Sequence, residues 1–169
     1  MISNVNLIGQ GEEVTIIDAE QTGRVITMEF CQNNIISDLT IKGGSSAEDA
    51  GGMLLETSNP TLTHVTITGN SAEYGGGMRL GSSSNPTLTH VTISGNTADY
   101  GGGMLLNSSN ATLTHVTITG NTADYGGGMD LGSSNPTLTH VTISGNSAEY
   151  LGGGMLLYSS NPTLTHVTI

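Results

Sequence analysis

The chain is 169 residues long, the length of one ordinary domain, and its 14 acidic residues against three Lys and Arg give a formal net charge of −11. DNA, RNA and anionic membranes require clustered Lys and Arg, so this charge excludes them as partners. It is compatible with cations, neutral glycans or water. Cys31 is the single cysteine, which excludes an intramolecular disulfide and a cysteine metal site.

The N-terminal third contains short apolar runs with the alternation typical of strands. Ile36–Ile41 has the same pattern as the later run Leu62–Ile67, and Ile2–Leu7 is expected to be a still earlier copy. Val14–Ile17 adds an apolar run to what we expect to be a longer first coil. No run approaches the roughly 20 apolar residues of a membrane helix, and the first residues do not form a signal-peptide pattern.

From residue 59 onward one unit recurs almost verbatim, and its first residue returns every 25 or 26 residues, at Asn59, Asn85, Asn110, Asn135 and Asn161. A fixed period of this length indicates stacked supersecondary units. We therefore expect one domain over residues 1–169, with degenerate coils in 1–52 and near-identical repeats in 53–169. Because the last repeat is incomplete, we expect the chain to be a fragment of a larger protein.

The unit that begins at Asn85 predicts three short strands. Thr87–Thr89 and Val91–Ser94 each alternate polar and apolar residues, but they are out of phase. Their apolar side chains face one interior only if the chain bends at His90. After a Gly-Asn turn signal and three glycines, Met104–Leu106 forms the third strand.

These elements predict an all-β fold, a right-handed parallel β-helix (β-solenoid) of about six to seven coils of about 25 residues, with three short strands per coil. Strands of successive coils would stack about 4.8 Å apart, and right-handed winding is the default for parallel crossovers. Phe30 is expected to match Leu55 in the interior. An interior methionine column is expected at Met28, Met53, Met78, Met104, Met129 and Met155.

Two motifs alternate along the repeats, Gly75-Gly76-Gly77-Met78 and Ile67-Thr68-Gly69-Asn70 in the first full unit. Their pairing resembles the Gly-Gly-Ala-Ile-type and Phe-x-x-Asn-type motifs of polymorphic outer-membrane-protein repeats and related β-helix repeats of the pectin-lyase-like class. The resemblance covers essentially the whole chain and implies a secreted or cell-surface bacterial or archaeal parent. Lyases, hydrolases, adhesins and scaffolds share this fold, so the resemblance does not choose among functions.

A histidine recurs at the predicted bend. Stacked imidazoles about 4.8 Å apart are able to bind a transition metal or to respond to pH. However, Asn4 and Asp38 are expected to hold the same position in earlier coils, and Asn, Asp and His are the non-glycine residues that most readily adopt positive φ. We therefore interpret the column as a structural bend ladder without metal. Its members are His64, His90, His115, His140 and His166.

An acidic residue recurs in the loop before the glycines, from Glu48 onward. Ca²⁺ takes 6–8 oxygen ligands, and loop carbonyls are able to add to such carboxylates, so a cation ladder is one interpretation. A solvated acidic edge with no cofactor is the interpretation we prefer. The candidate cation ladder consists of Glu73, Asp99, Asp124 and Glu149.

An asparagine column follows the corner glycine in each unit. Stacked amides at a corner are expected to satisfy backbone groups of the loops, with no catalytic role. Its members are Asn70, Asn96, Asn121 and Asn146.

The outward residues of the Gly-Met strand are the natural place to look for catalysis. Glycosidases use paired carboxylates, and lyases of this fold use a basic residue beside acidic metal ligands. Arg79 and Asp130 lie two coils apart, about 10 Å, which is not the spacing of a catalytic pair. We therefore expect no enzymatic activity. The outward row is expected to be Glu29, Leu54, Arg79, Leu105, Asp130 and Leu156.

Outward threonines form ranks about 4.8 Å apart between coils and about 6.7 Å apart along a strand. Flat Thr-x-Thr arrays resemble the ice-binding faces of other β-solenoids, although the strand propensity of Thr also explains them. The ranks consist of Thr61, Thr63, Thr66, Thr87, Thr89, Thr92, Thr112, Thr114, Thr117, Thr137, Thr139 and Thr142.

The sequence thus predicts a non-catalytic structural or adhesive β-helix repeat module of a secreted or cell-surface protein. Ice binding is the first alternative, and a glycan-binding or polysaccharide-lyase-derived fragment is the second. The expected partners are ice or a surface glycan and further copies of the chain, with no nucleic acid and no membrane. Self-association is expected because an uncapped end would expose Leu164, Val167 and Ile169 together with unpaired backbone groups.

Overall fold

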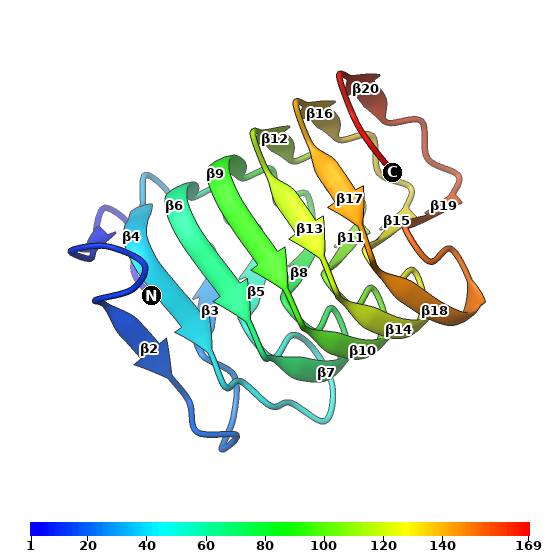
Figure 1. The fold of residues 1–169 in the computed structure, drawn as a ribbon. Coiled ribbons are helices and arrows are strands. Elements are labelled where there is room, and N and C mark those ends of the chain that lie inside the picture. Colours follow the sequence, from blue (N-terminus) through cyan, green and yellow to red (C-terminus); the bar gives the residue numbers. More distant parts are fainter.

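The computed structural model describes all residues, 1–169, and the chain winds into a β-solenoid built from strands alone. Figure 1 shows successive coils stacked side by side from the N-terminal to the C-terminal end. Every strand pairing is parallel, as the sequence predicted. The chain contains no helix with the length and apolar character needed to cross a membrane.

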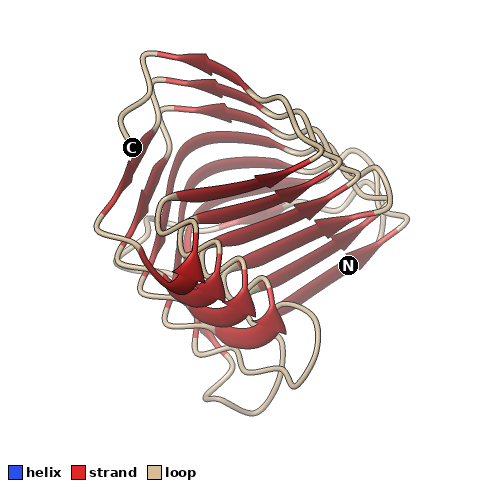
Figure 2. Cartoon of the chain, turned by 90° about the vertical axis from the view of Figure 1, so that its right-hand side faces the viewer, coloured by secondary structure: helices blue, strands red, loops and turns tan.

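Three sheets run along the solenoid, and Figure 2 shows them as walls around a common interior. The Thr sheet has ten strands: β1 (Leu7–Ile8), β2 (Ile16–Asp18), β4 (Ile35–Lys42), β6 (Thr61–Thr68), β9 (Thr87–Ser94), β12 (Thr112–Thr114), β13 (Thr117–Thr119), β16 (Thr137–Thr139), β17 (Thr142–Ser144) and β20 (Thr163–Thr165). The Tyr sheet has four: β7 (Ser71–Tyr74), β10 (Thr97–Tyr100), β14 (Thr122–Tyr125) and β18 (Ser147–Leu151). The Met sheet has six: β3 (Ile26–Glu29), β5 (Met53–Glu56), β8 (Met78–Gly81), β11 (Met104–Asn107), β15 (Met129–Gly132) and β19 (Met155–Tyr158).

A bend inside the Thr sheet brings the apolar residues of the two out-of-phase alternations to the same interior. In β9, Leu88, Val91 and Ile93 are all at most 1% exposed, although a straight strand would send Leu88 and Val91 to opposite faces. His90 between them has φ 52°, in the left-handed region. In later coils the bend interrupts the strand completely, giving β12 and β13 in place of one long strand.

The glycines before the Met sheet let neighbouring coils approach closely. Gly101 has φ 67°, a conformation that strongly favours glycine. A Cβ on Gly103 would lie only 2.5 Å from the carbonyl oxygen of Gly128 in the next coil and 3.0 Å from the Asn121 side chain. The glycine repeat therefore reflects close backbone stacking between coils.

One continuous apolar core of 27 buried residues fills the interior. In each internal repeat it takes two residues from the Met sheet and three from the Thr sheet. In one such repeat these are Met78, Leu80, Leu88, Val91 and Ile93, each at most 1% exposed. The predicted interior position of the repeat methionines is confirmed for Met53, Met78, Met104 and Met129, which are fully buried.

The predicted alignment of the Met sheet is wrong in the first coil. Ile26 pairs with Met53, 27 residues later, and Met28 pairs with Leu55. Met28 is buried, but it stands in the leucine column. Phe30 lies beyond the strand and is 75% exposed. The corner loops of the early coils differ in length from those of the later repeats, so a constant period misplaces these residues.

The predicted alignment of the first Thr-sheet strand is also wrong. Leu7 pairs with Ile36, and Ile17 pairs with Ile41. Residues 9–15 therefore form a loop where later coils have a single bend residue, and the run at Val14–Ile17 completes this rung instead of adding an extra strand. Asn4 has the positive φ of 61° expected of a bend. It belongs to another corner, however, because its side-chain oxygen accepts a hydrogen bond from Asn33.

Candidate functional site

The histidines form a continuous external stack along the bend of the Thr sheet. All five have φ between 50° and 53°, the positive φ that the bend argument predicted. Neighbouring ring centroids are 4.7–5.1 Å apart and the ring planes are within 8° of parallel. Asp38 continues the ladder toward the N-terminus, with its Oδ1 3.9 Å from Nδ1 of His64. The rings are therefore stacked face to face along the bend.

The acidic residues and the tyrosines run side by side along the Tyr sheet. Tyr74, Tyr100 and Tyr125 stack with ring centroids 5.2–5.3 Å apart, and Tyr150 lies 5.2 Å from Tyr125 with its ring tilted by 33°. A hydrogen bond to the Glu73 carboxylate raises the pKa of Tyr74, and Glu149 does the same to the pKa of Tyr150. No group of three or more His, Cys, Asp or Glu side chains is placed to hold a metal ion.

The asparagine ladder is buried and connects each coil to the next. The Oδ1 atom of Asn96 accepts hydrogen bonds from the backbone N–H and from Nδ2 of Asn70, both at 3.0 Å. The Nδ2 atom of Asn96 in turn donates to the carbonyl of Ile67 at 3.0 Å. Asn121 repeats the pattern one coil further on. Each amide thus satisfies buried backbone groups of a neighbouring coil.

The threonine ranks are in register from coil to coil on both halves of the Thr sheet. Thr61 pairs with Thr87, and Thr66 pairs with Thr92. The later coils continue both ranks. In each internal coil the bend at the histidine separates the first pair of ranks from the second. The outer surface of this sheet therefore consists of two threonine strips with the histidine stack between them.

A buried serine ladder was not predicted from the sequence. The N–H of Ser58 donates to Oγ of Ser84 at 3.1 Å, and Ser109 makes the same bond to Ser134. Cys31 takes the serine position in the first coil, since its N–H donates to Oγ of Ser58 at 2.9 Å. The constant serine before each Asn59-type residue was the available signal.

The outer face of the Met sheet carries a row that changes residue type from coil to coil. Strand pairing aligns Thr27, Leu54, Arg79, Leu105, Asp130 and Leu156 in this row. The sequence analysis placed Glu29 first in this row. That placement is wrong, because Thr27 pairs with Leu54 and Glu29 pairs with Glu56. Leu105 separates Arg79 from Asp130, so the two charged side chains occupy different places on the face.

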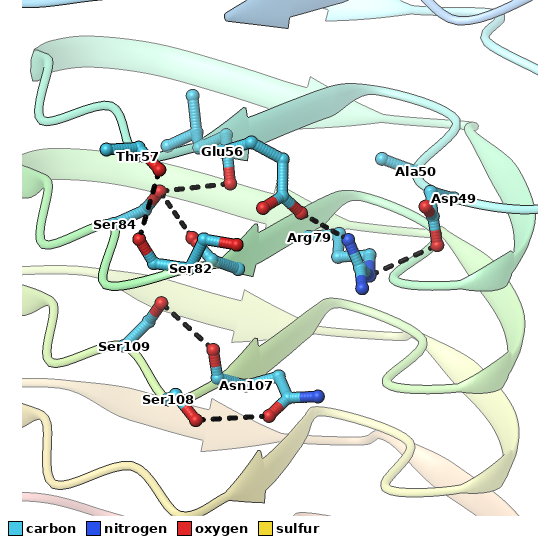
Figure 3. Close-up of polar contacts among 12 residues, drawn as sticks. Asp49, Ala50, Glu56, Thr57, Arg79, Ser82, Ser84, Asn107, Ser108 and Ser109 are labelled. Atoms are coloured by element: carbon cyan, nitrogen blue, oxygen red, sulfur yellow. Dashed lines mark hydrogen bonds and ion pairs between the residues drawn. The ribbon is translucent and has the colours of Figure 1, made fainter. Parts of the chain in front are cut away.

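Arg79 is held by two carboxylates. Its Nη1 donates to Oε1 of Glu56 at 2.5 Å, and its Nε lies 3.1 Å from Oδ1 of Asp49. Figure 3 shows the guanidinium reaching Glu56 on one side and Asp49 on the other. The Nε contact has the distance of an ion pair, although the N–H is not directed for a hydrogen bond. Arg79 is therefore neutralised within the structure.

Asp130, unlike Arg79, has no partner of opposite charge. Its side chain points outward from β15 but is only 9% exposed, because Leu105 and Leu156 flank it on the paired strands. It makes no hydrogen bond and no ion pair within the chain. Burial raises the pKa of this carboxyl group to about 6. A hollow of about 250 Å³ opens beside it, lined also by Tyr74, Tyr100, Leu105, Asn107 and Tyr158.

The fold and these ladders define the chain as a parallel β-helix repeat protein. A family model described as a right handed beta helix region matches residues 3–126 and 72–169. The chain therefore belongs to the right-handed β-helix family, which confirms the predicted fold. No curated protein and no solved structure matches the chain.

Proposed function

We propose that the chain is a non-catalytic repeat module of a secreted or cell-surface protein, with a structural or adhesive role. The observation that carries the proposal is the equivalence of the internal coils. The buried asparagine and serine ladders repeat the same hydrogen bonds between successive coils. A third, exposed asparagine ladder does the same, since the N–H of Asn85 donates to Oδ1 of Asn59 and the N–H of Asn110 donates to Oδ1 of Asn85. An array of this kind lengthens by adding coils and presents the same side chains at every step.

The resemblance of the Gly-Gly-Gly-Met and Ile-x-Gly-Asn motifs to polymorphic outer-membrane-protein repeats supports the surface location. The arrangement of charges supports a role without catalysis. Arg79 is bound to Glu56 and Asp49, and Asp130 lies between leucines on the other side of Leu105. The two carboxylates beside Arg79 are engaged in ion pairs with it, and Asp130 has no second carboxylate in the hollow beside it.

Removal of one coil tests this proposal. Deleting residues 110–134 joins Ser109 to Asn135 and keeps the repeat in register. We expect the variant to fold, with a lower melting temperature, and to retain adhesion to bacterial surfaces or immobilised glycans in proportion to the remaining coils. Polysaccharide substrates should give no unsaturated product by absorbance. Product formation that depends on Asp130 would overturn the non-catalytic assignment.

Ice binding is the second candidate, and the in-register threonine strips favour it. Strands about 4.8 Å apart place the hydroxyl and methyl groups of each rank at a regular spacing. A thermal hysteresis measurement tests it, with Thr92→Lys and Thr117→Lys disrupting one strip. Hysteresis in the wild type that these changes abolish would replace the adhesive proposal, while its absence at millimolar protein would eliminate ice binding.

A further inference from the structure

We propose that the hollow beside Asp130 is a binding site for an organic cation, specifically an ammonium group on an aliphatic stem. The inference goes beyond the proposed module role, which requires no such site. It rests on a buried, unpartnered carboxyl group that faces an apolar and aromatic hollow.

The carboxyl group of Asp130 lacks every partner that would normally accompany burial. The residue is 9% exposed and makes no hydrogen bond and no ion pair within the chain, and its carboxylate oxygens are not fully enclosed. Buried charges in proteins are normally paired, because desolvation of an isolated carboxylate is costly. Its pKa of about 6 leaves it mostly ionised at pH 7. An external cation would supply the missing charge partner.

None of the three basic side chains of the chain is available to do so. Arg79 is paired with Glu56 and Asp49. Lys42 lies 3.3 Å from Asp18, and the Nε of Arg24 donates to the carbonyls of Asp49 and Ala50. The cation therefore has to come from another molecule.

The walls of the hollow suit an alkylammonium ion better than a bare metal ion. Leu105 offers an apolar surface for methylene groups, and Tyr74, Tyr100 and Tyr158 add aromatic rings that attract cations. Asp130 is the only carboxylate among the lining residues, and the other side-chain oxygens are the Asn107 amide oxygen and the hydroxyls of the three tyrosines. Ca²⁺ is bound mainly by carboxylate and carbonyl oxygens, of which the side chains of this lining offer few.

The repeat also shows that the acidic residue is not needed for folding. The same position in the row is Leu105 in the preceding coil and Leu156 in the following coil. Asp130→Leu therefore installs a residue that the architecture already accepts at that place. This variant removes the charge without removing the strand, the tyrosines or the leucine walls.

The test is a titration with butylammonium chloride at constant ionic strength, followed by intrinsic fluorescence of the protein. The chain has five tyrosines and no tryptophan, and three of the tyrosines line the hollow, so the signal includes the rings around it. We expect saturable binding, weakened at least 10-fold in Asp130→Leu and in Asp130→Asn. Glu29→Gln removes an exposed carboxylate elsewhere on the Met sheet and should leave the affinity unchanged.

Three outcomes would overturn the proposal. Equal affinity of wild type and Asp130→Leu for butylammonium would remove the role of the carboxylate. Equal binding of neutral butanol would show an apolar hollow without charge selection. Saturable, Asp130-dependent binding of CaCl₂ without butylammonium binding would show a metal site. As a supporting outcome, tighter binding of Nα-acetyl-lysine amide than of glucosamine would indicate a lysine side chain as the source of the amine.

Discussion

Each internal asparagine of the buried ladder serves two coils at once. Its side-chain oxygen accepts two hydrogen bonds from the preceding coil, and its side-chain nitrogen reaches a carbonyl there. Single residues of three types thus decide separate properties of the molecule. The asparagines form hydrogen bonds with buried backbone groups at the corner between the Thr sheet and the Tyr sheet. The histidines adopt the positive φ that the bend requires, and Asp130 introduces a charge that no side chain of the protein neutralises.

Asn96→Ala tests the contribution of the buried asparagine ladder to stability. The change removes the acceptor of the Asn70 N–H and the Asn96 donor to the carbonyl of Ile67, while Nδ2 of Asn70 keeps its bond to the carbonyl of Ile41. Each unsatisfied buried group costs about 1–3 kcal/mol, so we expect a loss of about 2–5 kcal/mol in chemical denaturation. Asn85→Ala is the matched control, because the Asn85 side chain also accepts a bond from the next coil but is exposed. Equal losses would contradict the buried-ladder argument.

His90→Asn and His90→Val test the bend. Asn adopts positive φ readily and should change the unfolding free energy by less than about 0.5 kcal/mol. Val resists the observed φ of 52° and should cost at least about 1–2 kcal/mol. Denaturant melts of both variants give the comparison. If the two losses are the same, or if zinc raises the melting temperature by several degrees, the histidine does not act as a bend residue alone.

Asp130 predicts a specific pH dependence of stability. Its folded pKa of about 6 lies above the ordinary value of 3.8, so between these values the folded state binds more protons than the unfolded state. Stability contributed at this site is therefore present at low pH and is lost as pH rises through about 6. Asp130→Leu should remove this loss and stabilise the protein at pH 8 by up to about 3 kcal/mol. Melting curves at pH 4.5 and 8 check it, and a stabilisation that is the same at both pH values would contradict the titration argument.

At the scale of the element, each strand divides into an inward and an outward face by simple alternation. In β11, Met104 and Leu106 are fully buried while Leu105 between them faces the outer hollow. The Thr sheet follows the same rule on each side of its bend. The two halves of each Thr-sheet strand are joined by a residue with positive φ. This residue lets the apolar side chains of both halves face the same interior, where they form three columns.

Met104→Asp and Thr92→Lys test these faces. Met104 is fully buried, so a carboxylate there would be an unpaired charge in a narrow core, and we expect the fold to be lost. Thr92 lies on the outer strip and should accept Lys with a change below about 0.5 kcal/mol. Circular dichroism and denaturant melts distinguish the two. Tolerance of Asp at position 104 would mean that the faces are assigned in reverse.

At the scale of the whole molecule, the core is continuous and each internal coil covers the next. The last coil lacks a following coil, and its apolar residues are correspondingly exposed: Leu157 is 44%, Leu164 is 45% and Ile169 is 63% exposed. Such an edge also presents unpaired backbone groups of β20. The stability of the array therefore depends on what covers its ends.

We expect the 169-residue chain to self-associate through this surface. A two-fold contact between C-terminal coils would give a dimer, and a head-to-tail contact would give a filament. Light scattering at increasing concentration measures the association, which Leu164→Lys combined with Ile169→Lys should weaken. A wild-type species that stays monomeric at millimolar concentration would refute the expectation.

The repeats could be predicted in detail from the sequence, while the first two coils could not. From Asn59 onward the period is 25 or 26 residues, and equivalent residues pair except at the inserted Leu151, which pairs with Tyr125. The methionine column, the asparagine ladder and the histidine bend therefore follow from counting. In the first two coils the loops differ in length, and pairing depends on which side chains are able to enter the core. Ile26, not Met28, therefore faces Met53.

The sequence by itself determined the solenoid, its period and the inward or outward direction of the repeated side chains, because these depend on alternation and spacing along one strand. Only the tertiary structure decided what becomes of an outward side chain. Asp130 faces away from the core, yet it is buried by leucines about 25 residues away on either side and by tyrosines of the adjacent sheet. Burial and unmet charge arise from contacts between coils, which local sequence patterns do not encode.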